Sequence, residues 1–141
     1  MNYAKIGAMS FILWGLLHIV GGGAILLAVG ESPAAGFAIY EQSAAPYTEL
    51  AGSVLGYLAY GFVWIAVVVT FVGIRYNWQN SQAGLALNIA LVGLTDLGLV
   101  VFLVLPGFIG WGEASPGLIL FAVGAIAGGI ACNTGHAASA A

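Results

Sequence analysis

The chain has 141 residues, of which 62% are hydrophobic and only 5% are charged, and its mean hydropathy is +1.07. Ordinary soluble domains carry about a quarter charged residues, so this composition predicts a membrane protein. Two basic against five acidic residues give a net charge of −3, which excludes a basic surface for nucleic acid. A single cysteine, Cys132, excludes an intramolecular disulfide and a cysteine-rich metal cluster.

Four apolar segments are long enough to cross a bilayer, whose hydrocarbon core of ~30 Å needs ~20 residues per helix. They cover residues 6–29, 51–74, 83–105 and 115–133. The first is too long for the apolar region of a signal peptide, so we interpret it as a span. All four prolines fall between spans or at their ends, as uninterrupted helices require. The predicted fold is all-α: one domain forming an integral membrane four-helix antiparallel bundle.

The two basic residues set the expected orientation. Lys5 precedes the first span and Arg75 follows the second. The positive-inside rule then places both of them, and both termini, in the cytoplasm, and we expect a bacterial inner membrane. The first connection, residues 31–50, is predicted to be an interfacial loop. The short connection YNWQNSQ predicts that spans two and three are antiparallel neighbours.

A weak internal similarity raises the alternative of two parallel two-helix repeats. Shifting the chain by 78 residues places GLLH (15–18) over GLTD (93–96), and also Ser10 over Asn88. Both ionisable residues that lie inside spans then coincide. Parallel repeats are related by an axis along the membrane normal, which would set spans one and three facing each other. A chance match of glycine and leucine stays the competing interpretation.

Polar residues of three spans are expected at one depth. With ~1.5 Å of rise per residue, His18 lies ~18 Å and Asp96 ~20 Å from the cytoplasmic ends of their spans, and Tyr60 lies ~14 Å below the outer surface. Gly124 of the fourth span reaches the same level. Because an isolated ionised Asp in hydrocarbon costs a few kcal/mol, we predict that Asp96 is protonated or paired with His18.

Helical spacing assigns these residues to faces that we expect to point inward, since a carboxylate or imidazole facing lipid would find no partner. On the first span the face holds Ser10, Trp14 and His18; on the second, Tyr57, Tyr60 and Trp64; on the third, Asn88, Val92, Thr95 and Asp96. The predicted intramembrane polar site therefore consists of His18, Asp96, Tyr60, Asn88 and Thr95.

Four uses of this site stay open: a hydrogen bond that only fixes helix pairing, proton-coupled transport, ligation of a haem or chlorophyll-type pigment, and catalysis on a lipophilic substrate. Imidazole is a common axial ligand, and Gly21–Gly23 beyond His18 would let a flat macrocycle approach. His18 would then be the metal ligand. Enzymatic activity is not favoured, because Ser10 lies ~12 Å along the helix from His18 and forms no nucleophilic arrangement with it.

Two GxxxG patterns are predicted to pack helices closely: Gly52 with Gly56, and Gly124 with Gly128. They are expected to pack spans two and four within the monomer, or to bind copies of this chain or another subunit. With four spans and short connections, the sequence predicts an oligomeric or accessory subunit of a larger membrane complex, surrounded by lipid. Proton-coupled transport or cofactor binding at the polar site is the alternative.

Overall fold

The computed structural model describes residues 2–32 and 49–139, and within these residues it consists of four long helices, with short connections between the second and third helices and between the third and fourth. These are α1 (Tyr3–Glu31), α3 (Glu49–Arg75), α4 (Gln82–Leu99) and α5 (Trp111–Ser139), with a 3-10 turn η1 (Asn77–Gln79) between α3 and α4. The candidate membrane spans are Tyr3–Glu31, Ala51–Gln79, Gln82–Val104 and Trp111–Thr134. The prediction of an all-α, four-span fold is confirmed. The interfacial loop predicted for residues 31–50 lies largely outside the described residues.

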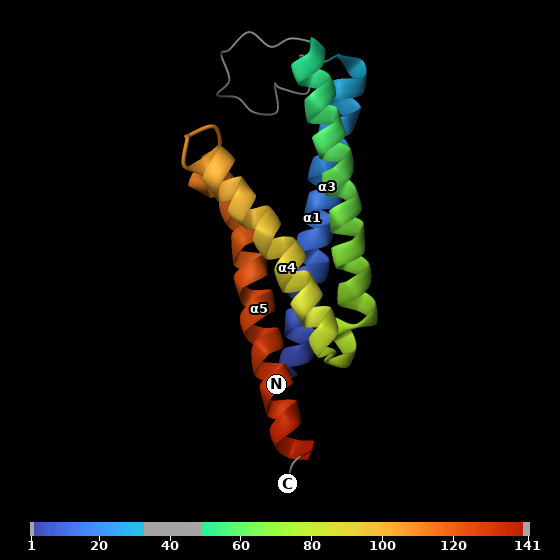
Figure 1. The fold of residues 1–141 in the computed structure, drawn as a ribbon, viewed down its shortest axis with the longest axis vertical. Coiled ribbons are helices and arrows are strands. Elements are labelled where there is room, and N and C mark those ends of the chain that lie inside the picture. The colour runs from blue at the N-terminus through green and yellow to red at the C-terminus, as the bar shows by residue number, and fades with distance from the viewer. Residues whose placement is uncertain (1, 33–48, 140–141) are drawn as a thin grey trace.

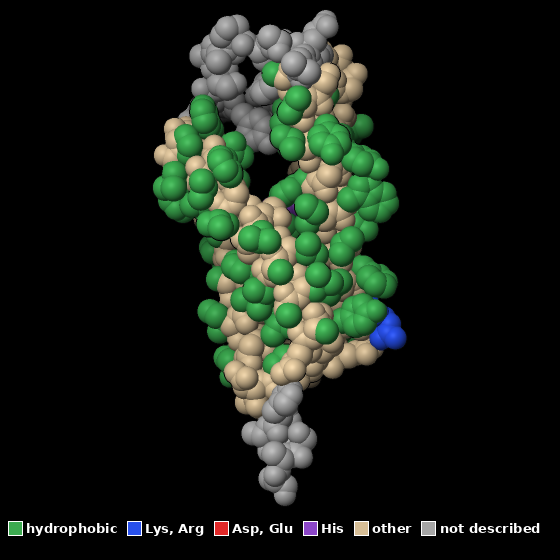
Figure 2. Space-filling view, viewed as in Figure 1, with side chains coloured by type: hydrophobic (Ala, Val, Ile, Leu, Met, Phe, Trp, Pro, Cys, Tyr) green, Lys and Arg blue, Asp and Glu red, His purple; other side chains and the backbone are tan. Residues whose placement is uncertain are grey.

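The helices form two antiparallel hairpins, α1–α3 and α4–α5, which meet at one end and diverge toward the other (Figure 1). The helix α1 is central, because it packs most extensively against α3 and next against α5. The chain's N-terminal end, η1 and the start of α4 lie at the closed end of this wedge (Figure 1). We call this the basic end, since Lys5 and Arg75 belong to it, and the other the open end. Toward the open end, a hollow separates the two hairpins (Figure 2).

Small residues bring α1 and α3 into close contact along their length. They recur at every seventh position of both helices: Ala8, Gly15 and Gly22 on α1 lie against Gly73, Ala66 and Ala59 on α3, respectively. Larger side chains of the two helices, such as Ile12 on α1 and Val63 on α3, pack against the small residues of the opposite helix. A Cβ at Gly22 would lie 2.8 Å from Val63, and one at Gly73 would lie 2.8 Å from Ile12. Close backbone approach of this kind is what holds helices together in lipid, where no hydrophobic effect drives them together.

The contact between α1 and α5 pairs large residues of one helix with glycines of the other. Phe11 lies over Gly124, Gly7 lies against the backbone at Gly128, and Leu85 of α4 covers Gly128 from the other side. Gly56 of the first GxxxG pattern faces Val29 of α1. Gly56, Gly124 and Gly128 therefore pack within the monomer, mainly against α1, which occupies the centre of the wedge.

Irregular backbone marks the ends of α4 and α5 near the outer connection. The helix α4 continues as a π-helical segment η2 (Val100–Val104) just before Pro106, and Leu105 donates to the carbonyl of Val100 at 2.9 Å. Proline ends the regular helix because it cannot donate a backbone hydrogen bond. Gly107 follows with a φ of 83°, a value that favours glycine. The connection therefore turns sharply and leads directly into α5.

The helix α5 begins at Trp111, four residues before the predicted span, and contains Pro116 in its second turn. Proline leaves the carbonyl of Gly112 without its usual helical donor. The hydroxyl of Ser115 donates to that carbonyl at 3.1 Å. Glu113 accepts a hydrogen bond from the amide of Gly110 at 2.6 Å and completes the start of the helix. The Ser115 side chain thus replaces the one backbone bond that this proline removes.

Candidate functional site

The site begins with His18, which lies half-buried on α1 between the hairpins. Its Nδ1 lies 2.7 Å from the carbonyl oxygen of Trp14, one turn earlier on the same helix. A carbonyl only accepts, so Nδ1 carries the hydrogen, and in the neutral ring Nε2 is an acceptor. The imidazole stacks on the Trp14 indole with ring centroids 3.9 Å apart and meets the edge of Phe62 at 5.1 Å.

Trp14 connects His18 to Asp96. The indole Nε1 donates to Oδ1 of Asp96 at 3.2 Å, which joins α1 to α4 inside the bundle. Asp96 is only 3% exposed, and its Oδ2 is buried with no hydrogen-bond partner among the described residues. The depth count placed Asp96 and His18 at one level, and of the two predicted states of Asp96, protonated or paired with His18, the direct pair does not form. Trp14 is the partner of Asp96 instead, because its longer side chain lies between the two helices and the imidazole stacks beside it.

Asn88 and Thr95 lie on α4 and use their polar groups differently. Asn88 is fully buried, donates to the carbonyl of Val69 at 3.3 Å, and leaves its Oδ1 without a partner in the described structure. Thr95 donates to the carbonyl of Leu91 at 2.7 Å within its own helix. Asn88 therefore links α4 to α3, whereas Thr95 makes no hydrogen bond to another described helix.

Tyr60 does not join this site. The face of α3 that carries Tyr57, Tyr60 and Trp64 points outward, with exposed fractions of 76%, 54% and 55%. The expectation that this face points inward is wrong. The inward face of α3 is the one with Ala59, Ala66 and Gly73, because only small side chains allow the close approach of α1. Helical spacing grouped the three aromatic residues correctly, but aromatic character did not indicate the side.

A tetrapyrrole does not fit at His18 while the helices stay packed. A Cβ at Gly117 of α5 would lie 3.2 Å from Cε1 and 3.5 Å from Nε2 of His18, so this edge of the imidazole lies against the α5 backbone. Axial ligation through Nε2 would require α5 to move away. Gly22 is covered by α3, while Gly21 and Gly23 face open space. Within residues 2–32 and 49–139, no group of three or more His, Cys, Asp or Glu side chains could hold a metal ion.

The site is therefore a short buried series of rings and one carboxyl group, His18–Trp14–Asp96, spanning α1 and α4. Spacing indicated His18 and Asp96 from the sequence, whereas the role of Trp14 depends on helix packing. Comparisons with known protein families, curated proteins and solved structures find no match to this chain. The fold and the four apolar spans define a four-span helical membrane protein.

Proposed function

We propose that this chain is a structural or accessory subunit of a membrane complex, built from copies of itself or with other membrane proteins. The observation that supports this proposal is the outward face of α3, formed by Tyr57, Tyr60, Gly61 and Trp64 and called here the aromatic face. Apolar side chains elsewhere on the surface suit lipid (Figure 2). The aromatic face differs because its phenol and indole groups lie along the length of α3, whereas Tyr3, Tyr76, Trp78 and Trp111, which are also exposed, lie near the ends of helices.

The depth of the aromatic face argues for a protein partner. Trp64 is the fourteenth residue of the 29-residue candidate span Ala51–Gln79 and so lies at its middle. Trp and Tyr favour the membrane interfaces, where their polar groups reach water. Within the part of the chain that the structure describes, neither the Trp64 indole nor the Tyr60 hydroxyl makes a hydrogen bond; the two rings meet edge to face at 6.3 Å. A neighbouring helix would supply acceptors that lipid tails lack.

Gly61 adds the space that such a helix needs. It lies four residues from Tyr57 and three from Trp64, and a Cβ there would meet nothing within 4 Å. A helix crossing at Gly61 could approach the backbone closely, with aromatic rings on both sides. Small residues at the crossing and polar side chains beside it are the features that associate membrane helices.

Particle size tests this proposal. In several mild detergents, we expect a complex much larger than one 14.3 kDa chain. Trp64→Leu, combined with Tyr60→Phe, should reduce the size or release co-purifying chains. The matched control is Phe102→Leu, which changes an aromatic residue exposed on η2. A monodisperse wild-type monomer in all these detergents would refute the proposal, as would equal assembly of the double variant and wild type.

We further propose a bacterial inner membrane with both termini in the cytoplasm. The support is that both basic residues belong to one end of the bundle, where Lys5 lies 5.6 Å from the centre of the Trp78 ring. Reporter fusions at each terminus test the orientation: a cytoplasmic reporter should be active at both ends. Activity of a periplasmic reporter at either end would contradict it.

A second candidate function is the handling of a proton by His18–Trp14–Asp96 during transport. The specific support is the buried Oδ2 of Asp96, which has no partner in the described chain, and the Nε2 of His18, which can accept a proton. Intramembrane ionisable residues often act in proton relays. In proteoliposomes, Asp96→Asn should abolish pH-dependent flux while the protein stays folded. If Asp96→Asn changes only thermal stability, or if the wild type shows no flux, this function is excluded.

A further inference from the structure

A second set of buried polar groups lies at the basic end, where α1, η1, α4 and α5 meet. Asn77 of η1 is 5% exposed, and both its Oδ1 and its Nδ2 are buried without a hydrogen-bond partner among the described residues. Buried amides are nearly always hydrogen-bonded, to protein or to ordered water, because an unsatisfied one carries its full desolvation cost. The side chain of Asn77 is held in place by Gly84, where a Cβ would lie 2.6 Å from Oδ1.

Asn77 lines a small cavity. Its volume is about 10 Å³, and its lining includes Asn80, Ser81 and Cys132 beside the apolar residues of α1, α4 and α5. One water molecule needs about 10–15 Å³ and two to four polar partners. The volume thus matches a single water, and it is too small for a larger ligand.

The polar groups around the cavity have hydrogen-bonding capacity left. Ser81 accepts from the amide of Gly84 at 3.2 Å, so its own hydroxyl hydrogen is not used in that bond. Asn80 donates from Nδ2 to the carbonyl of Ala131 at 3.1 Å and accepts from the Cys132 thiol at 3.5 Å. An amide has two donor hydrogens and two acceptor lone pairs, so Asn80 retains one of each.

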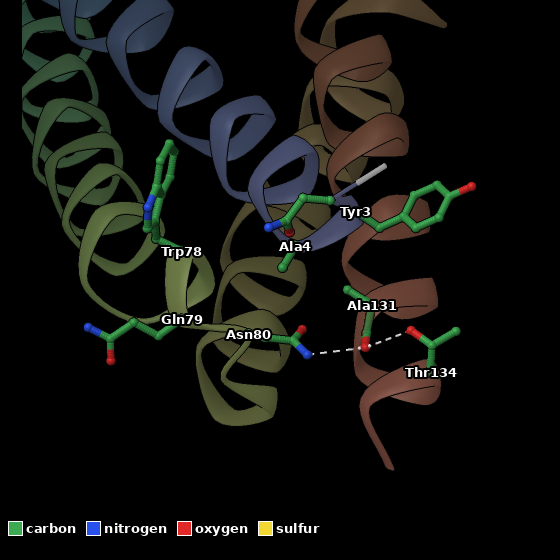
Figure 3. Close-up of a pocket in the computed structure, with 8 residues that line it drawn as sticks. Tyr3, Ala4, Trp78, Gln79, Asn80, Ala131 and Thr134 are labelled. Atoms are coloured by element: carbon green, nitrogen blue, oxygen red, sulfur yellow. Dashed lines mark hydrogen bonds between the residues drawn. The ribbon is translucent and has the colours of Figure 1, made fainter. Parts of the chain in front are cut away.

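An open groove of about 700 Å³ lies next to the cavity at the surface of the basic end. Figure 3 shows this groove between the start of α1, the η1 turn and the last turns of α5, with Asn80 bonded to Ala131 on one side. Ala4 and Asn80 line both the groove and the cavity. The groove is lined in part by exposed polar side chains such as Gln79, so it provides water with a route to Asn77.

We propose that the cavity beneath Asn77 is a binding site for one water molecule, held by Asn77, Asn80 and Ser81 and exchanging through the groove. This site is independent of the proposed function. Its water connects η1 to the residues that lead into α4, next to Gly128 and Cys132 of α5, at the end where the two hairpins meet. The bound water forms hydrogen bonds with the side-chain amide of Asn77, which would otherwise be buried without a partner.

Water-to-protein magnetisation transfer, measured by solid-state NMR on the full chain in lipid bilayers, tests this site. Amide groups labelled with ¹⁵N supply internal references: the Gln79 side chain is exposed, and the backbone amide of Ala66 is fully buried in the middle of α3. We expect the Asn77 side-chain amide to receive magnetisation from water as quickly as Gln79 does, and the Ala66 amide to stay slow. Transfer at Asn77 as slow as at Ala66 would overturn the proposal.

A pair of substitutions then separates a bound water from general hydration of the bundle. Ala4→Leu fills the position that lines both the cavity and the groove, and it should cause loss of the Asn77 water signal. Ala86→Leu adds the same volume at an exposed position of α4 and should leave that signal unchanged. Equal signals in these two variants would overturn the proposal, even if wild-type Asn77 is hydrated.

Discussion

Gly15→Ala tests the close contact between α1 and α3. A Cβ at position 15 would lie 2.7 Å from the carbonyl oxygen of Ala66 and 3.2 Å from the amide nitrogen of Thr70, with the Thr70 hydroxyl nearer still. That hydroxyl is held by its own 2.8 Å hydrogen bond to the Ala66 carbonyl. The added methyl group therefore meets backbone and a fixed side chain, neither of which can move alone.

The size of the effect follows from these distances. Ordinary contact requires about 3.4 Å, so the contact with the Ala66 carbonyl alone requires the two helices to separate by about 0.7 Å (3.4 − 2.7) at this level, and the nearer Thr70 hydroxyl requires more. Gly22 and Gly73 belong to the same contact and would lose packing as well. Inserting one methyl group into a packed core costs about 1–3 kcal/mol, and we expect about 2 kcal/mol here.

The free energy of unfolding can be measured by titrating the protein with a denaturing detergent in mixed micelles and following tryptophan fluorescence. The matched control is Gly21→Ala, because a Cβ at Gly21 meets nothing within 4 Å. We expect the control to retain wild-type stability. If Gly15→Ala lowers the unfolding free energy no more than Gly21→Ala does, the two helices are not held by close backbone contact.

Three further substitutions test other contacts by the same unfolding assay. Trp14→Phe removes the donor to Asp96 and should lower the free energy of unfolding by about 1–3 kcal/mol. Adding Asp96→Leu to this variant should recover part of the loss, because no buried carboxyl group then lacks a partner. An equal loss in the single and the double variant would show that the bond contributes little. Asn80→Ala removes its bonds to Ala131 and Cys132 and should cost about 1 kcal/mol for each; an unchanged stability would contradict this. Gly107→Ala forces a side chain into a φ of 83° and should cost about 1–2 kcal/mol, a loss not expected for Gly112→Ala in the first turn of α5.

The sequence determined the number of spans and most of their limits, because a bilayer fixes the length of an apolar helix. One of the differences falls where a side chain replaces a backbone bond. The fourth span was predicted from residue 115, yet α5 begins at Trp111, since Ser115 satisfies the Gly112 carbonyl that Pro116 leaves without a donor and Glu113 accepts from the Gly110 amide ahead of the helix. Two ionisable residues in apolar spans were equally clear in the sequence, and counting residues placed His18 and Asp96 at one depth.

Only the tertiary structure decided which faces meet. Spacing groups Tyr57, Tyr60 and Trp64 on one face of α3, but the close approach of α1 selects the opposite face, with Ala59, Ala66 and Gly73. Depth alone also could not distinguish His18 from Trp14 as the partner of Asp96. A hydrophobic pattern tells the inside from the outside when the solvent is water. In lipid both sides are apolar, so the fit between small and large side chains decides the packing.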